Sequence, residues 1–209
     1  MIGIHDLPLF IAAGLLLNVT PGPDIALVMG QSVRHGRRGG VLAALGVGAG
    51  CFIHIGAAAL GLSALIMTSA LAFTVIKWIG VCYLCYVGVR MLFSRDQESK
   101  QVIPDTTSPR AIFWLGFFTN ALNPKVALFF LAFLPQFIDQ NAPNKAAAFA
   151  LLGLMFTATG VLWLLLVAWL TARASAGLRA NAHIKVWLER TIGAMFLALG
   201  AKLAFSSKS

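Results

Sequence analysis

The chain has 209 residues, of which 59% are hydrophobic and only 11% are charged, and its mean hydropathy is +0.84. A soluble domain carries about 25% charged residues, so this chain has too few charges to cover a water-exposed surface. The net charge of +9 does not indicate nucleic-acid binding, because the basic residues are scattered among short loops rather than gathered on one face. Composition therefore predicts an integral membrane protein and argues against a disordered chain, a disulfide scaffold or a secreted enzyme.

Six apolar runs are long enough to cross a bilayer as helices, since about 20 apolar residues span its hydrocarbon core. They do not alternate polar and apolar residues, as the strands of a membrane barrel would. No basic stretch precedes the first run, so we expect that helix to be retained rather than cleaved as a signal peptide. The runs are Leu7–Ser32, Val41–Ile66, Ala70–Phe93, Ala111–Ile138, Ala146–Leu170 and Val186–Phe205.

Basic residues follow the first, third and fifth runs, as Arg34, Arg37 and Arg38 do after the first. Basic loops stay in the cytoplasm, so both termini are expected on the outer side of the membrane. No soluble domain remains, and residues 1–209 are predicted to form a single transmembrane domain.

The two halves of the chain resemble each other. An odd number of spans per half means that the second half is inverted, and inverted repeats are typical of transporters. We therefore predict an all-α membrane protein of six transmembrane helices in an inverted 3+3 arrangement, with repeat one at 1–93, a cytoplasmic loop at 94–110 and repeat two at 111–209. The matching segments are Pro23–Leu27 with Pro124–Leu128, Ile79–Gly80 with Ile192–Gly193, and Gly88–Phe93 with Gly200–Phe205.

The first and fourth spans should be interrupted at equivalent places. Pro21 and Pro23 cannot donate backbone hydrogen bonds, and Gly22 between them permits dihedral angles that other residues avoid. Asn123 and Pro124 form the second interruption. Irregular backbone at membrane depth is tolerated where it is buried in protein or lines a watery cavity, so the two breaks predict a transport site.

Two charged residues lie beside these breaks, although a charge at the bilayer centre costs at least about 2.5–3.5 kcal/mol. Asp24 could hold a substrate ammonium or take up a proton; alternatively, it could stabilise a helix start or pair with Lys125. Lys125 could attract a substrate carboxylate, or its stem could snorkel to the interface.

The predicted substrate site takes in both breaks and the polar residues beside them, with Asp24 also as the proton-coupling group. The amide and hydroxyl side chains could read a zwitterion or satisfy carbonyls freed by the prolines. No metal site, cofactor or catalytic constellation is predicted. The residues are Asn18, Thr20, Pro21, Gly22, Pro23, Asp24, Asn120, Asn123, Pro124 and Lys125.

On the Pro21-Gly22-Pro23 signature, the Asn123-Pro124-Lys125 motif, the six-span plan and its size, the chain resembles the LysE/RhtB family of amino-acid exporters. The resemblance covers essentially the whole length. It implies export of amino acids such as threonine, homoserine, leucine or lysine from the bacterial cytoplasm, driven by the proton gradient. The location implied is the inner membrane, with both termini in the periplasm.

Two rival functions rest on other residues. Cys51 and His54 have metal-ligand spacing on one helix face and would suit a heavy-metal exporter, although metal sites need three or four ligands. Cys82 and Cys85 have redox spacing and would suit a thiol electron carrier, although no cysteine occurs in the second half.

The function predicted is therefore efflux of an amino acid by proton antiport with alternating access. A neutral substrate is favoured over a basic one, because a basic side chain would need a second buried carboxylate. The partners are the amino acid, protons and the bilayer. Gly46 and Gly50 give the second span a small-residue face, which favours close helix packing and is also compatible with a homodimer.

Overall fold

The computed structural model describes residues 3–62, 108–139 and 141–173, together with six isolated positions between 75 and 89. These residues form helices joined by short connections. The predicted spans Ala70–Phe93 and Val186–Phe205 lie outside the described residues except for those six positions, so the six-helix inverted repeat stays a prediction. The elements are α1 (Leu7–Val19), α2 (Pro23–Gly56), π-helix η1 (Ala57–Leu62), α5 (Pro109–Ala121), α6 (Pro124–Leu128), π-helix η2 (Phe129–Phe133), 3-10 helix η3 (Leu134–Phe137) and α7 (Lys145–Arg173).

The first predicted span is interrupted, as expected. Helix α1 ends at Val19, and Thr20 follows it with extended backbone angles, which the residue before a proline prefers. Helix α2 then starts at Pro23, a position where the missing N–H of proline costs nothing. The interruption therefore follows directly from the two prolines.

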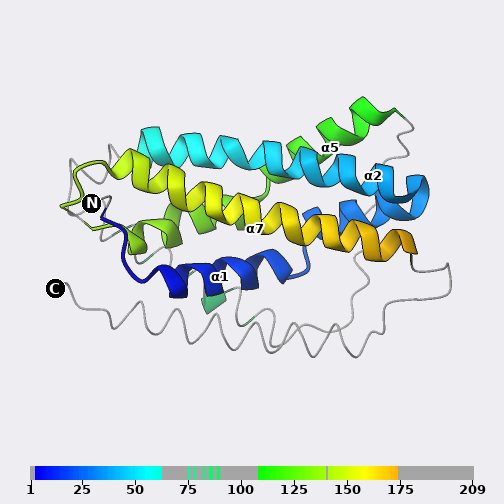
Figure 1. The fold of residues 1–209 in the computed structure, drawn as a ribbon. Helices are drawn as coiled ribbons and strands as arrows, with labels where there is room; N and C mark the ends of the chain where they lie inside the picture. The colour runs from blue at the N-terminus through cyan, green and yellow to red at the C-terminus, as the bar shows by residue number, and fades with distance from the viewer. Residues whose placement is uncertain are drawn as a thin grey trace.

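Helix α2 is a hairpin of two arms. His35 and Gly36 depart from helical angles, and Gly36 has a φ of +62°, which glycine adopts without strain. Asp24 and Cys51 line one cavity, although a straight helix would hold them about 40 Å apart. The chain therefore reverses at His35 and Gly36, at one end of the bundle (Figure 1).

The fourth predicted span is also broken. Helices α5 and α6 are separated by Leu122 and Asn123, and the segments on either side meet at a bend of 43°. Asn123 begins α6 as its cap, and its Oδ1 accepts a hydrogen bond from the Lys125 N–H at 3.0 Å. After Leu128 the span continues as η2 and η3 instead of a regular α-helix.

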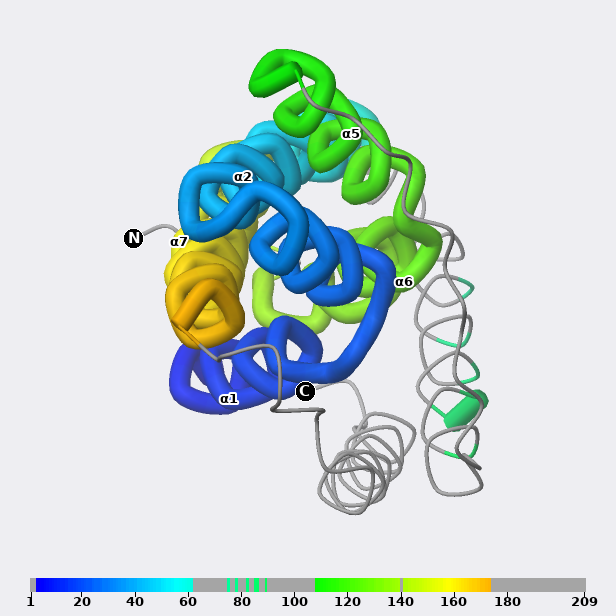
Figure 2. Tube along the Cα trace, turned by 90° about the vertical axis from the view of Figure 1, so that its right-hand side faces the viewer, coloured from blue at the N-terminus to red at the C-terminus, as the bar shows by residue number. Residues whose placement is uncertain are grey.

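The helices pack around two apolar clusters. One cluster is rich in phenylalanine and joins α1, the end of α2, α6 to η3 and α7, with Phe10, Phe129 and Phe156 among its members. The other joins both arms of α2 to α5 and α7 through smaller residues such as Ala43 and Ala168. Viewed end-on, the first arm of α2 lies near the middle of the bundle, with α7, α1 and α6 around it (Figure 2).

The small residues of α2 are packing residues. A Cβ on Gly46 would collide with the carbonyl oxygen of Phe113, and one on Gly50 would collide with that of Phe117. In return, Gly116 of α5 approaches the backbone of α2 at Ala43. The prediction of close helix packing is confirmed, and because α5 occupies this face, the face no longer argues for a homodimer.

The outer surface of the bundle suits lipid. Two described segments, Pro23–Gly61 and Lys145–Arg173, are long and apolar enough to cross a membrane. The bent pair Pro109–Ala121 and Pro124–Phe137 is a third candidate span if its two helices are counted as one. Because α2 doubles back at His35 and Gly36, Pro23–Gly61 is not one straight helix. Large apolar side chains such as Leu122 and Leu162 are exposed, which lipid tolerates and water does not.

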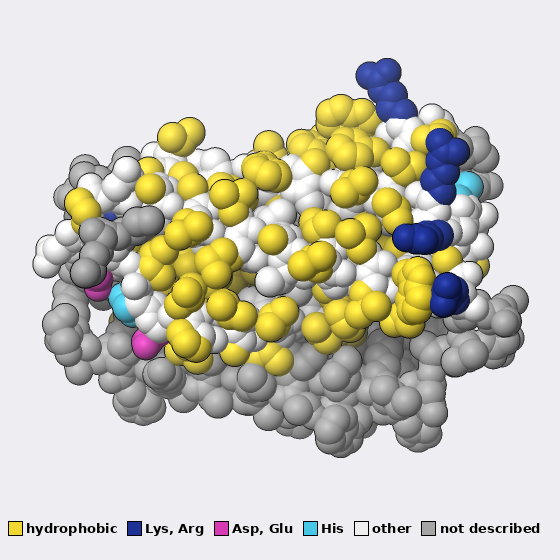
Figure 3. All heavy atoms as spheres, viewed as in Figure 1, with side chains coloured by type: hydrophobic (Ala, Val, Ile, Leu, Met, Phe, Trp, Pro, Cys, Tyr) yellow, Lys and Arg dark blue, Asp and Glu magenta, His cyan; other side chains and the backbone are white. Residues whose placement is uncertain are grey.

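Charges are segregated along the bundle. Figure 3 shows Lys and Arg side chains gathered at one end, whereas the acidic side chains lie at the other; histidine side chains appear at both ends. We call the first the basic end; it holds the kink of α2 and the carboxyl end of α7 (Figure 1). The arginines of these segments are Arg34, Arg37, Arg38 and Arg173.

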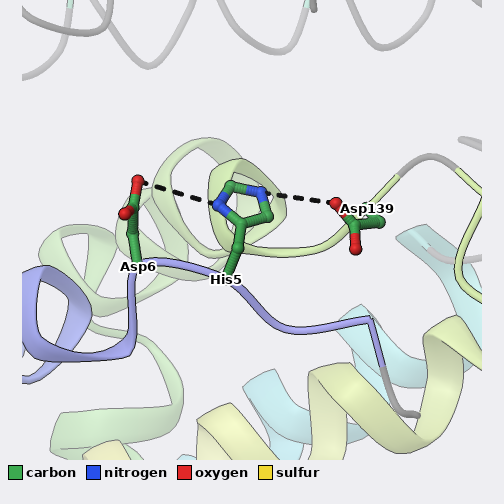
Figure 4. Close-up of polar contacts among 3 residues, drawn as sticks. All are labelled: His5, Asp6 and Asp139. Carbon is green, nitrogen blue, oxygen red and sulfur yellow. Dashed lines mark ion pairs between the residues drawn. The ribbon is translucent and has the colours of Figure 1, made fainter.

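At the opposite end, the segment before α1 is fastened to the residues after η3. Ile4 and Ile138 form an isolated antiparallel bridge, and the His5 N–H donates to the Phe137 carbonyl at 3.1 Å. His5 also lies between two carboxylates, 3.7 Å from Asp6 and 4.0 Å from Asp139 (Figure 4). These side chains are exposed, so the backbone bonds are the stronger part of this strap.

Candidate functional site

A cavity of about 40 Å³ lies between the two helix breaks, where the two apolar clusters meet. It has room for a few water molecules. Seven of the ten predicted site residues line it. They are Asn18, Thr20, Gly22, Asp24, Asn120, Asn123 and Lys125.

The Asp24 carboxylate lies in the first turn of α2, where the helix dipole favours a negative charge. Its Oδ2 accepts two hydrogen bonds from the other break, from Asn120 Nδ2 at 3.0 Å and Asn123 Nδ2 at 3.1 Å. Its Oδ1 is buried and has no hydrogen-bond partner among the described residues, and the same is true of Asn120 Oδ1. Two residues that line the cavity therefore each have a buried acceptor atom that no described group satisfies.

The Lys125 ammonium reaches back to the first break. Its Nζ donates to the carbonyl oxygens of Leu17 at 2.9 Å and Thr20 at 3.0 Å. In a continuous helix, Leu17 would bond to the N–H of residue 21, which Pro21 lacks. Lys125 therefore satisfies a carbonyl that the proline leaves unpaired, and it keeps one proton for another acceptor.

Asp24 and Lys125 do not form a direct ion pair within the described residues. The carboxylate is held by amides and the ammonium by carbonyls, each from the opposite break. The pairing considered from sequence is thus replaced by a reciprocal arrangement. Each break supplies a charged group that binds polar groups of the other.

The remaining predicted residues have structural partners. Asn18 Nδ2 donates to α7, at the Phe156 carbonyl and Thr159 Oγ1, and the Thr20 hydroxyl donates to the Leu16 carbonyl at 2.6 Å. Gly22 is extended, an angle open to any residue, so its predicted special dihedral angles are a correction. A Cβ there would lie 3.5 Å from Lys125 Nζ, an ordinary van der Waals contact, so space does not require glycine either.

Pro21, Pro23 and Pro124 break the helices but are not among the cavity-lining residues of the described chain. Their substrate contact stays a prediction. Their contribution in the structure is to expose the carbonyl groups and helix ends that the polar side chains then bind.

Sequence reasoning missed the wall contributed by α7. Phe156, Thr157, Gly160 and Val161 line the cavity, and a Cβ on Gly160 would lie 2.9 Å from Asn18 Oδ1. The only signal for them was a pair of threonines and a glycine inside an otherwise apolar run. Such residues are also common in plain helix packing.

The rival sites gain no support from the described residues. There, no group of three or more His, Cys, Asp or Glu side chains could hold a metal ion. The three cysteines are free thiols: Cys51 is buried in the cavity wall, Cys85 is partly buried and Cys82 is exposed.

Comparison with known proteins points to one group. The LysE type translocator family matches residues 15–207. An uncharacterised membrane protein of Bacillus subtilis is 31% identical over 97% of this chain and 100% of its own length. Homoserine/homoserine lactone efflux proteins of Salmonella typhimurium and Salmonella typhi are 30% and 29% identical, each over 93% of this chain and 94% of their own length. No solved structure matches the chain.

The family match extends over nearly the whole chain and takes in both helix breaks and every residue lining the cavity. It agrees with the apolar, lipid-compatible surface of the bundle. The chain therefore belongs to the LysE type translocator family and is a multi-pass membrane transporter of a small molecule.

Proposed function

We propose that this chain exports a neutral amino acid from the bacterial cytoplasm across the inner membrane, in exchange for protons. The observation that carries the proposal is that two residues lining a cavity between two broken helices, Asp24 and Asn120, each have a buried Oδ1 with no partner among the described residues. Buried acceptors without donors are costly, and a substrate ammonium offers three donors and the opposite charge.

The carboxylate of the substrate would approach the remaining proton of Lys125. Ammonium and carboxylate then bind groups from opposite repeats, so a zwitterion bridges the two breaks. An α-amino acid carries both groups on the same carbon, and the need for both groups selects it over a simple amine or acid.

The rest of the wall favours a neutral side chain. Val47, Val161 and Leu164 are apolar, and Thr157 adds a hydroxyl group. Asp24 is the only carboxylate among the described lining residues, and its charge is matched by the substrate ammonium. A second cationic group on the substrate would have no partner. Homoserine, named for the Salmonella relatives, has the uncharged side chain that this wall suits.

The single carboxylate in the described lining supports exchange with protons. A deprotonated Asp24 binds the ammonium from the cytoplasmic side, and after outward opening a proton from outside takes its place and the amino acid leaves. The protonated, empty site then returns and releases its proton inside. The Asp24 carboxylate thus binds either the substrate ammonium or a proton, one at a time.

Alternating access needs one end of the bundle to open at a time. The phenylalanine cluster and the strap close the end opposite the arginines. Basic residues favour the cytoplasmic side, so the basic end faces inward and the strap faces the periplasm, with the amino terminus outside. The present arrangement then corresponds to a state closed to the outside.

The test is uptake of labelled homoserine, threonine, leucine and lysine into inside-out vesicles, with and without a collapsed pH gradient. Neutral amino acids should accumulate, and collapse of the gradient should abolish accumulation. Asp24→Asn should lose gradient-driven accumulation, whereas Asp24→Glu should retain part of it. Full proton-coupled transport by Asp24→Asn would refute the coupling role.

A further inference from the structure

His54 is a buried, titratable residue outside the cavity lining described above. It lies on the second arm of α2, one turn after the cavity residue Cys51, and only 7% of it is exposed. Its ring is 5.7 Å from that of Phe130. Its Nε2 lies 3.0 Å from the main-chain oxygen of Asn120.

That oxygen is special because of the proline that follows. In an unbroken helix the Asn120 carbonyl would accept a hydrogen bond from the N–H of residue 124, but Pro124 has none. The Asn123 N–H closes a tight turn onto the same oxygen at 2.8 Å, and His54 adds a second donor from another helix. A carbonyl only accepts, so the hydrogen lies on Nε2 of the imidazole.

The first break has the same design. There Pro21 leaves the Leu17 carbonyl without its helical donor, and Lys125 supplies one from the other repeat. Each break is thus held by a side-chain donor that comes from a distant segment of the chain. His54 serves the second break as Lys125 serves the first.

The side chain of Asn120 has two polar atoms that matter for binding. The Asn120 side chain donates to Asp24 at 3.0 Å, and its own Oδ1 is one of the two unpartnered oxygens. When the main chain of Asn120 is held in place, the directions of its side-chain Nδ2 and Oδ1 are restricted as well. Resting on the function proposed above, we infer that His54 is a positioning residue, which holds Asn120 so that its oxygen and that of Asp24 converge on the substrate ammonium.

The test uses Cys51 as a reporter, because this thiol lies in the cavity wall. On a Cys82→Ser/Cys85→Ser background, modification of Cys51 by methyl methanethiosulfonate is followed by mass spectrometry at increasing homoserine concentration. His54→Leu should raise the concentration for half-maximal protection about tenfold, since it leaves the carbonyl short of a donor. His54→Gln keeps an N–H at similar reach and should stay within about twofold of the parent.

Ile55→Val is the matched control, since Ile55 is a buried neighbour on the same turn. It should lower the melting temperature in detergent without moving the protection curve. A His54→Leu curve within twofold of the parent, or a His54→Gln curve as weak as that of His54→Leu, would overturn the positioning role while the proposed function stands. Absence of protection by every amino acid in the parent would remove both.

Discussion

At the scale of single residues, the site is built around the backbone N–H groups that proline does not have. Pro21 and Pro124 each remove a backbone N–H, and the carbonyls left behind are bound by Lys125 and His54. Lys125 also lines the cavity and carries a charge, so a side chain that binds a helix end also sets the electrostatics of the cavity. Structure and function at the breaks therefore share residues.

Lys125 should affect binding through the substrate carboxylate. In the parent, homoserine should protect Cys51 at a lower concentration than homoserine amide, which lacks the carboxylate. In Lys125→Met, homoserine and homoserine amide should protect Cys51 at similar concentrations, because the ammonium proton that would bind the substrate carboxylate is lost. The measurement is the same thiol-protection assay with both ligands.

Lys125→Met should also lower the melting temperature, since two buried carbonyls lose their donor at a cost of about 1–3 kcal/mol each. Lys145→Met is the control: Lys145 is buried as well, but at the start of α7 and outside the cavity lining. Equal discrimination between the two ligands in Lys125→Met and the parent would contradict the carboxylate role.

The sequence alone identifies the residues at the two breaks, but it does not identify which side chains donate to the carbonyls exposed there. The prolines act on neighbouring carbonyls, so their effect can be read locally. The bond from Lys125 to Leu17 joins residues 108 positions apart, and the bond from His54 to Asn120 spans 66. Such pairings depend on how the helices fold together, which is why the metal-ligand interpretation of His54 was as reasonable from sequence as its role as a donor.

At the scale of elements, α2 and α5 cross with their backbones in contact, through Gly46 and Gly116. Gly46→Ala should destabilise the protein, because the new methyl group would meet main-chain atoms of α5 that cannot move aside. Gly56→Ala should be neutral or slightly stabilising, since its Cβ has no described atom within 4 Å. Melting temperatures in detergent measure both; equal values would contradict the close crossing.

The break between α5 and α6 should trade stability for activity. Pro124→Ala restores an N–H that can bond to Asn120, straightening the helix and competing with His54. We expect an unchanged or higher melting temperature and at least tenfold slower transport in vesicles. Faster or unaltered transport would show that the bend of 43° is dispensable.

Helix positions were predicted well where the apolar runs are long. Leu7–Ser32 coincides with α1 and the first arm of α2, and Ala146–Leu170 lies inside α7. The π and 3-10 turns of η2 and η3 were not foreseen. Pro135 removes one regular bond there, but which turn type results depends on the packing of the phenylalanines around it.

At the scale of the whole molecule, the strap should control opening of the end that we propose faces the periplasm. Ile4 and Ile138 face each other in a non-hydrogen-bonded antiparallel pair, where side chains are closest. On a background without native cysteines, Ile4→Cys/Ile138→Cys should form a disulfide that stops transport, and a reductant should restore it. Each single substitution is the control, and undiminished transport by the oxidised pair would place the outer gate elsewhere.

Orientation can be tested on the same background. Asn141→Cys, at the strap end, should react with a membrane-impermeant thiol reagent in intact cells. Arg38→Cys, at the basic end, should react only after the cells are permeabilised. The reverse pattern would invert the transport direction proposed here.

The reciprocal bonds at the two breaks also limit how the gene could be recombined. Consider a chimera that joins the first half of this chain to the second half of a distant relative. It would transport only if the relative's half supplied a donor for the Leu17 carbonyl and amide groups for Asp24. Because each half of the chain binds groups of the other, a substitution at one break constrains which residues can work at the other.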